Sequence, residues 1–321
     1  MMKHLTSLIL LSTLISVSAC KKKTIKVQGV TRIESGTSAR LNKVSCNGGI
    51  CIVCGGERFL SAEILRSADN GNSWTFGSYP DAGKGMYGMG RTPAGTLYLS
   101  GVDGKVLMSK DNGITWSIKQ IPYWNYYLSA TCPSENRLMF ANTAAQNYGN
   151  VLRIDSSFNV IDTTFFKFGL NEVEMVNTKV GYLAGYGAVL KTIDGGDNWT
   201  YLDVKNDNFN GICALDENQV WVCGYGGSIF RTRNGGGSWE RLINGNNMLK
   251  KQYSFLGIYF KDSQNGWVFG EKGVLLGTTD GGDNWKAYES FTKEAIRDAT
   301  MAPDGGLITV GDNGNVYKLA L

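Results

Sequence analysis

The stretch that decides the fold is Ser67-Ala-Asp69-Asn-Gly71-Asn-Ser-Trp74, because the same pattern returns along the chain. Each copy begins with Ser or Thr, followed by Asp (once Asn), Gly and Trp at fixed offsets. The acidic or amide residue and the tryptophan of the five copies are Asp69 and Trp74, Asp111 and Trp116, Asp194 and Trp199, Asn234 and Trp239, and Asp280 and Trp285. Repetition at a regular period indicates that the chain is built from similar structural units.

The spacing of the copies predicts one more unit than the five intact copies display. The tryptophans are 42, 83, 40 and 46 residues apart, so the double interval should contain a degenerate copy. The segment 151–160 fills it, with Asp155 retained, Ser157 in place of Gly and Val160 in place of Trp.

Each period contains four apolar segments separated by turns, which is typical of one blade of a β-propeller. The 42 glycines and only 5 prolines agree with many short strands and tight turns. Residues 306–319 match the second and third strands of a seventh blade, which lacks an outer strand, and Val27 to Ser35 can supply it. We therefore predict an all-β, seven-bladed propeller of four-stranded antiparallel blades over residues 27–321, closed by the N-terminal strand, which removes exposed sheet edges.

The first residues have the pattern of an export signal. A basic start and a short apolar core end in Val17-Ser-Ala-Cys20, which resembles the lipobox of bacterial lipoproteins. We expect residues 1–19 to be a signal peptide, Cys20 to carry the lipid, and residues 20–26 to be anchor and linker. Lys rather than Asp after Cys20 favours the outer membrane, on its periplasmic side. The alternative is an ordinary signal peptide cleaved after Ala19.

Six cysteines follow Cys20, and export permits disulfides. A two-residue Gly48-Gly49 turn would place Cys46 and Cys51 opposite each other on a hairpin. A cross-strand disulfide and two buried free thiols both remain open for this pair. The other four cysteines are expected to be buried thiols.

Several functions are excluded by composition. The only histidine, His4, lies in the predicted leader, so histidine-activated nucleophiles and histidine metal ligands are absent from the body of the protein. We expect no metal and no cofactor. The net charge of +4 owes much to Lys21, Lys22 and Lys23, which gives no argument for nucleic-acid binding.

The repeated unit resembles the Asp-box, or bacterial neuraminidase repeat, of sialidases and other propellers. In such a hairpin Asp accepts backbone N–H bonds, Gly adopts a conformation that other residues resist, and Trp covers apolar surface. The fuller pattern, with Gly266-Trp-Val-Phe-Gly before the copy ending at Trp285, resembles the photosystem II stability and assembly factor family. That resemblance implies a non-catalytic propeller that binds a protein client during assembly of a membrane complex.

The alternative function is a sialidase-like glycoside hydrolase or a glycan-binding propeller. Sialidases need three convergent arginines, and their Arg-Ile-Pro motif is absent here, since Arg32 and Ile33 are followed by Glu34. A hydrolase with two carboxylates needs only a suitably spaced pair, for which Asp298 and Glu172 are the candidates. We predict that the protein is not an enzyme and that these two are solvated loop carboxylates.

Loops that join one blade to the next are rich in aromatic and basic residues, which suits a protein client or a glycan. The alternative is that many of these rings only pack the tops of the blades. The predicted binding residues are Trp124, Tyr126, Tyr127, Lys250, Lys251, Tyr253, Phe255 and Arg297.

Overall fold

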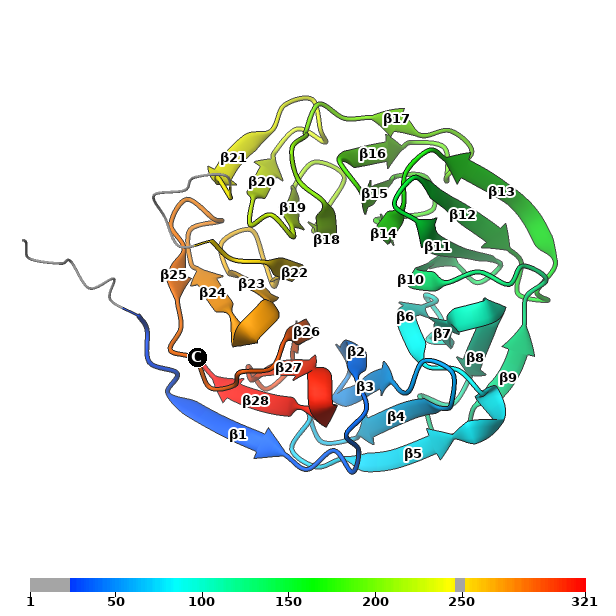
Figure 1. The fold of residues 1–321 in the computed structure, drawn as a ribbon, viewed down its shortest axis with the longest axis horizontal. Coiled ribbons are helices and arrows are strands. Elements are labelled where there is room, and N and C mark those ends of the chain that lie inside the picture. Colours follow the sequence, from blue (N-terminus) through cyan, green and yellow to red (C-terminus); the bar gives the residue numbers. More distant parts are fainter. Residues whose placement is uncertain (1–23, 246–251) are drawn as a thin grey trace, which may run out of the picture.

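A computed structural model describes residues 24–245 and 252–321 as seven four-stranded antiparallel sheets arranged in a ring (Figure 1). The predicted all-β propeller is confirmed. The predictions for residues 1–19, Cys20, Lys250 and Lys251 lie outside the described residues. Among the residues that are described, no helix is long and apolar enough to cross a membrane.

The strands run outward from the central axis in each blade. Blade 1 comprises β2 (Leu41–Asn47), β3 (Ile50–Gly55), β4 (Ala62–Ser67) and β5 (Thr75–Tyr79), and blade 2 comprises β6 (Met86–Arg91), β7 (Leu97–Gly101), β8 (Lys105–Ser109) and β9 (Ser117–Gln120). Blade 3 comprises β10 (Tyr127–Ser134), β11 (Arg137–Ala145), β12 (Tyr148–Ile154) and β13 (Val160–Phe166), and blade 4 comprises β14 (Leu170–Met175), β15 (Gly181–Gly185), β16 (Ala188–Thr192) and β17 (Thr200–Tyr201). Blade 5 comprises β18 (Phe209–Ala214), β19 (Val220–Gly224), β20 (Ile229–Thr232) and β21 (Glu240–Ile243), and blade 6 comprises β22 (Phe255–Phe260), β23 (Gly266–Gly270), β24 (Leu275–Thr278) and β25 (Lys286–Ala287). Blade 7 comprises β26 (Ile296–Met301), β27 (Leu307–Gly311), β28 (Val316–Ala320) and, as its outer strand, β1 (Gly29–Ile33).

The ring closes as predicted. Strand β1 pairs antiparallel with β28, from Gly29 opposite Ala320 to Ile33 opposite Val316 (Figure 1). Just before β1, Ile25 forms a parallel bridge with Tyr288 of blade 6, and its N–H donates to the Ala287 carbonyl at 2.8 Å. Residues 24–33, which we call the N-terminal strap, therefore hold blade 6 as well as blade 7.

The hydrophobic core lies between neighbouring blades. One cluster, for example, combines Leu41 and Val53 of blade 1 with Ile308 and Val316 of blade 7. Because neighbouring blades cover both faces of the second strand, that strand can be apolar throughout, as in Val220–Gly224. Burial is shared between sheets, so the blades stabilise one another.

Each Asp-box is a hydrogen-bonded turn that also contacts the preceding blade. In the first copy the Ser67 hydroxyl donates to Asp69 at 2.7 Å and accepts from the Gly71 N–H at 2.8 Å. Asp69 also accepts from the Ser73 N–H at 2.9 Å. Gly71 has φ +79°, and a Cβ there would lie 2.4 Å from Ile308 of blade 7. Glycine is required both for the turn and for the approach of the two blades.

A basic side chain reinforces this contact wherever the next blade has an intact Asp-box. This basic residue occupies an equivalent position on the third strand of each blade. Its side-chain nitrogen donates to a backbone carbonyl of the next blade, that of the residue after the Asp or Asn of the Asp-box. These inter-blade latches are Arg66 to Asn112, Arg153 to Gly195, Lys191 to Gly235, Arg231 to Gly281 and Lys318 to Asn70. Each latch satisfies a turn carbonyl with a charged donor.

Two joints of the described ring lack a latch, and each has a different contact. Blade 2 has Met108 at the latch position, and both Met108 and Phe158 of the degenerate turn pack against one apolar cluster. Blade 6 has Gly277 there, and the N-terminal strap joins it to blade 7 instead.

The first hairpin of blade 1 contains a disulfide. Cys46 and Cys51 are paired across β2 and β3 and their sulfur atoms are bonded. Gly48 and Gly49 both have positive φ, as a two-residue turn at this place requires. Of the two alternatives for Cys46 and Cys51, the structure therefore shows the disulfide. The other four cysteines are buried free thiols, as predicted: Cys54, Cys132, Cys213 and Cys223.

Candidate functional site

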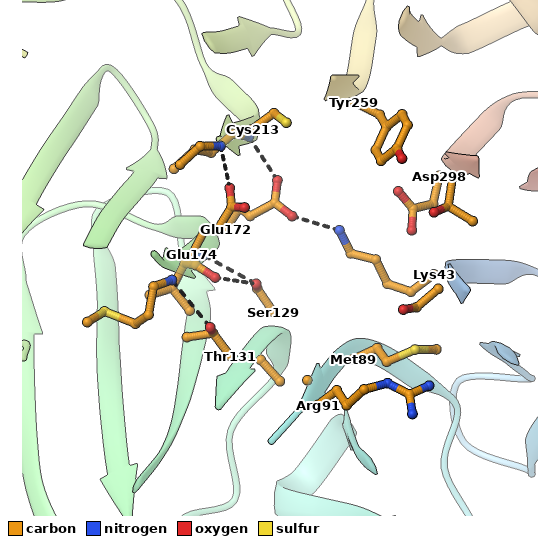
Figure 2. A pocket seen from close by; sticks show the side chains of 18 of the residues that line it. Lys43, Met89, Arg91, Ser129, Thr131, Glu172, Glu174, Cys213, Tyr259 and Asp298 are labelled. Atoms are coloured by element: carbon orange, nitrogen blue, oxygen red, sulfur yellow. Dashed lines mark hydrogen bonds and ion pairs between the residues drawn. The ribbon is translucent and has the colours of Figure 1, made fainter. Parts of the chain in front are cut away.

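The inner strands surround a central channel with a cavity of about 470 Å³ (Figure 2). The lining includes side chains from the third and fifth residues of these strands. Four of them carry a carboxyl or amino group: Lys43 on β2, Glu172 and Glu174 on β14, and Asp298 on β26. Arg91, the last residue of β6, also lines the cavity. Four blades thus supply the charged groups of the channel.

Lys43 lies between the two predicted carboxylates. Its Nζ is 2.7 Å from Glu172 Oε1, and Asp298 lies beside the same side chain (Figure 2). Burial opposes the charge of Lys43, but Glu172 and Asp298 outweigh it and raise the Lys43 pKa. Asp298 and Glu172 are therefore brought together in the channel, and the prediction that they are solvated loop carboxylates was wrong.

Each carboxylate also holds the next blade by accepting a backbone hydrogen bond. Glu172 accepts from the Ile212 N–H at 3.0 Å, and Asp298 accepts from the Val44 N–H at 2.8 Å. Neutral side chains do the same elsewhere, since the Ser129 hydroxyl accepts from the Val173 N–H at 3.2 Å. These polar side chains thus connect adjacent inner strands that share no ladder hydrogen bonds.

Two carboxyl groups of the channel, those of Asp298 and Glu174, have pKa values near neutral pH. Burial raises the pKa of Asp298 to about 6, against the attraction of Lys43. Burial and the neighbouring Glu172 raise the pKa of Glu174 to about 8. Raised carboxyl pKa values are found in general acids, but they also arise in buried structural groups. A hydrolytic pair needs an open space for the glycosidic bond, whereas Lys43 lies between Glu172 and Asp298 (Figure 2).

One end of the channel carries a cluster of cations and tyrosines, which we call the mouth cluster: Arg40, Arg58, Tyr87, Tyr126 and Arg297. Arg58 stacks over the Tyr126 ring at 4.8 Å, and the Tyr87 and Tyr126 rings are 4.8 Å apart. Arg40 lies 5.6 Å from the Tyr87 ring centre.

Arg297 joins the mouth cluster through an acidic residue. It donates two hydrogen bonds of 2.9 Å to Asp312, which is also 3.9 Å from Arg40. Two arginines thus share one carboxylate. Burial, followed by repulsion from Arg297, lowers the pKa of Arg40. Glu271 also lies 3.9 Å from Arg297, so two carboxylates contact the arginines of the mouth cluster, of which there are three. The remaining positive charge favours an acidic partner.

Exposed rings extend this surface beyond the mouth cluster. Trp124 is 74% exposed and Phe59 is 62% exposed. Arg58 and Lys84 lie 4.9 and 4.7 Å from the Phe59 ring centre. Large rings beside cations at the surface are typical of binding sites for proteins.

Two predicted binding residues, Tyr127 and Phe255, are fully buried and cannot contact a partner. Both occupy the first position of an inner strand, which is apolar and buried in every blade: Leu41, Met86, Tyr127, Leu170, Phe209, Phe255 and Ile296. The alternative that such rings pack the tops of the blades holds for these two. Tyr253 is partly buried and stacks on Phe255, with ring centres 5.8 Å apart. It precedes β22 of blade 6, whereas Trp124 and Tyr126 precede β10 of blade 3.

Sequence reasoning missed Arg40, Arg58, Phe59 and Lys43. Arg58 and Phe59 lie between β3 and β4. In a four-stranded antiparallel blade, this loop opens on the same face as the loops between blades, a relation that could have been derived from the strand order. Lys43 could have been found as the third residue of an inner strand, equivalent to Glu172 and Asp298.

Among the residues that the structure describes, no group of three or more His, Cys, Asp or Glu could hold a metal ion. Seven antiparallel blades, five Asp-box turns and a charged channel define the class: an Asp-box β-propeller. The family model described as photosynthesis system II assembly factor YCF48 matches residues 154–320, a little over half of the chain. This protein therefore belongs to the YCF48 assembly factor family.

Solved structures with the same fold include two of YCF48. YCF48 from Cyanidioschyzon merolae is 14% identical, with a TM-score of 0.70, 90% of this chain covered and 98% of that one. YCF48 bound to D1 peptide is 14% identical, with a TM-score of 0.72 and coverage of 94% and 100%. A catalytically inactive virginiamycin B lyase from Staphylococcus aureus is 10% identical, with a TM-score of 0.71 and coverage of 91% and 99%. No curated protein sequence matches this chain.

Proposed function

We propose that this protein is an exported, lipid-anchored, non-catalytic scaffold that binds a protein client over the mouth of its channel. The observation that carries the proposal is the mouth cluster together with two exposed rings: Phe59, which Arg58 contacts, and Trp124, which lies two residues before Tyr126. Membership of an assembly factor family supports a protein client, as does the peptide bound to YCF48 in one solved structure.

The chemistry of this surface suits a peptide segment. Tryptophan, tyrosine and arginine provide most of the binding energy at protein interfaces. Here Arg58 is already stacked on Tyr126, so less side-chain freedom is lost on binding than for an isolated arginine. Of the residues predicted from the sequence, Trp124, Tyr126 and Arg297 remain in the proposed contact.

The test compares two faces of the ring. Loops between blades and Asp-box turns lie at opposite ends of the strands, so Ile114, in the second Asp-box and 63% exposed, provides a matched apolar control. We expect the double variant Trp124→Ala, Arg58→Ala to recover about tenfold less client in a quantitative crosslinking pulldown. Ile114→Ala should recover as much client as the wild type. Equal recovery by all three proteins would contradict the proposal.

A glycoside hydrolase remains the second candidate, because Asp298, with a pKa of about 6, and Glu172 lie together in the channel. A lyase among the solved structures of this fold shows that such a ring can support catalysis in another protein. The purified protein would be incubated with chromogenic glycosides and sialosides. Turnover that Asp298→Asn or Glu172→Gln abolishes would establish an enzyme, whereas the scaffold predicts no turnover.

The lipid anchor rests on the sequence around Cys20, and metabolic labelling with palmitate, with Cys20→Ser as the control, tests it. Ile25, which is bound to blade 6, lies five residue steps after Cys20, with four residues between them. A fully extended chain of this length spans about 17 Å. An acylated Cys20 would therefore hold the edge of blades 6 and 7 close to the bilayer.

A further inference from the structure

The chain joins the ring at the end of the strands that carries the mouth cluster. Ile25 forms a bridge with Tyr288, which directly follows β25 in the loop that joins blade 6 to blade 7. The loops between blades all lie at this end, which we call the mouth end. Cys20 lies five residue steps before Ile25, so the proposed lipid anchor starts within about 17 Å of the mouth end of blade 6.

Exposed aromatic side chains are concentrated at the mouth end. Of the eight that are exposed in the described part of the chain, seven lie there, in loops between blades, in turns between second and third strands, or in strand residues beside them. Four of the seven lie in loops and turns: Phe59, Tyr123, Trp124 and Tyr225. The exception is Phe76, near the start of β5 and thus near an Asp-box turn. So uneven a distribution indicates that the mouth end faces a partner.

The remaining three exposed rings, on blades 3 and 4, form what we call the aromatic rim: Tyr148, Phe165 and Tyr201. Phe165 and Tyr201 are 60% and 61% exposed. The Tyr148 ring centre lies 6.0 Å from that of Phe165, and the Tyr201 ring centre lies 5.9 Å from that of Phe168. Exposed Lys167 stands between Phe165 and Phe168 in the sequence. The aromatic rim is therefore an apolar surface with a basic residue beside it.

The anchor and the aromatic rim lie on opposite sides of the ring, since β25 and β13 face each other across it (Figure 1). A tether at blade 6 alone leaves the ring free to tilt. A second contact at blades 3 and 4 determines which face meets the bilayer. Building on the proposed lipid anchor, we propose that the mouth end docks flat on the membrane surface, held by the lipid on Cys20 at one side and by the aromatic rim at the other.

The side chains of the aromatic rim suit a lipid surface. Tyrosine rings lie at the boundary between acyl chains and headgroups, because the ring is apolar and the hydroxyl stays hydrated. A lysine beside such rings is attracted to anionic headgroups, as Lys167 would be. In this orientation the mouth cluster faces the bilayer, where a loop of a client embedded in the same membrane would emerge, and the Asp-box turns face away.

Membrane docking and client binding use different side chains. Docking depends on Tyr148, Phe165 and Tyr201, whereas the proposed client contact depends on Trp124 and Arg58. Either proposal can therefore fail while the other holds.

Fluorescence quenching of the full-length lipidated protein tests the orientation. The protein is reconstituted in vesicles of phosphatidylethanolamine and phosphatidylglycerol that contain a lipid with a nitroxide headgroup, without any client. Asn147→Cys places a label in the exposed turn before β12, and Ile114→Cys places one in the exposed second Asp-box. The free cysteines of the described residues are buried. We expect the label at 147 to lose most of its fluorescence and the label at 114 to keep it, and equal quenching of both would overturn the proposal.

Ring removal tests whether the aromatic rim causes the docking. Phe165→Ser with Tyr201→Ser replaces two exposed side chains and should abolish most of the quenching at residue 147 while the protein stays on the vesicles. Phe76→Ser makes the matched change near the Asp-box end and should leave the quenching unchanged. Unchanged quenching in the double variant would overturn the proposal. So would a label at 147 that is quenched only after client is added, because the rim would then belong to the client contact.

A second arm separates the rim from the lipid anchor. Where palmitate labelling finds no lipid on Cys20, the anchor proposal has failed, and a histidine tag placed before residue 20 holds the protein on the same vesicles through a nickel-chelating lipid. The expected difference between the labels at 147 and 114 is the same in this arm. Its absence would overturn docking by the rim independently of lipidation.

Discussion

Arg231 and Arg233 contact the same two carboxylates but from different environments. The Arg231 side chain is 1% exposed and lies 2.6 Å from both Glu240 and Asp283. The Arg233 side chain is 61% exposed and lies 3.7 and 3.9 Å from them. The buried residue also donates to the Gly281 carbonyl at 2.7 Å, as the latch between blades 5 and 6.

We expect Arg231→Ala to lower the free energy of unfolding by about 2 kcal/mol, because it removes a buried guanidinium, its two ion pairs and one of the two hydrogen bonds to the Gly281 carbonyl. Arg233→Ala should lower it by about 1 kcal/mol or less, because exposed pairs are weak. Urea unfolding of the three proteins measures both effects. Equal losses in the two variants would contradict the role of the latch.

Glu174 makes stability depend on pH. Its pKa rises from the ordinary value of 4.5 to about 8 in the folded protein. Between these values the folded state binds a proton that the unfolded chain has released, so this contribution to stability falls as the pH rises through the window.

Glu174→Gln removes that dependence because glutamine stays neutral. We expect the stability of the variant relative to the wild type to increase by about 1 kcal/mol or more between pH 5 and pH 9. Unfolding in urea at pH 5, 7 and 9 measures the difference, with exposed Glu289→Gln as the control. Parallel pH profiles for wild type and Glu174→Gln would count against a buried, neutral Glu174.

The buried rings illustrate what a sequence does and does not determine at one residue. Tyr127 and Phe255 are aromatic residues near predicted loops, as Trp124 is. Their burial follows from the strand position at which each lies, and a shift of one residue exchanges core and surface. The strand boundaries predicted from the repeats were not accurate enough to make this distinction.

At the scale of elements, the Asp-box turns could be predicted because their residues repeat at fixed offsets. Their contact with the preceding blade was not predicted, although part of the signal is in the sequence. Arg66, Arg231 and Lys191 each precede the Ser or Thr of a box directly. Only the assembled ring shows that such a residue binds the turn of the next blade and not its own.

The N-terminal strap should stabilise the whole ring, since it completes blade 7 and joins blade 6. We expect a chain that begins at Glu34 to lose about 3 kcal/mol or more relative to one that begins at Thr24. It lacks buried Val27 and the β1 ladder. It should also aggregate, because β28 becomes an open edge. Denaturant unfolding and light scattering compare the two chains, and equal stability and solubility would rule out closure by the strap.

At the scale of the whole molecule, the number of blades and the closure of the ring could be predicted from sequence periodicity alone. The mouth cluster could not, because it combines Arg40, Tyr87, Tyr126 and Arg297 from four places in the chain. Periodicity places strands in order, but it does not determine which loop side chains meet across the ring.

The central claim is that the client binds the face with the loops between blades. Amide hydrogen exchange of the protein with and without its crosslinked client tests this most directly. The account predicts slower exchange in residues 56–61 and 121–126 when the client is bound, with no change in the Asp-box turns at 69–74 and 111–116. Slower exchange in those turns alone, with the two loops unchanged, would contradict it.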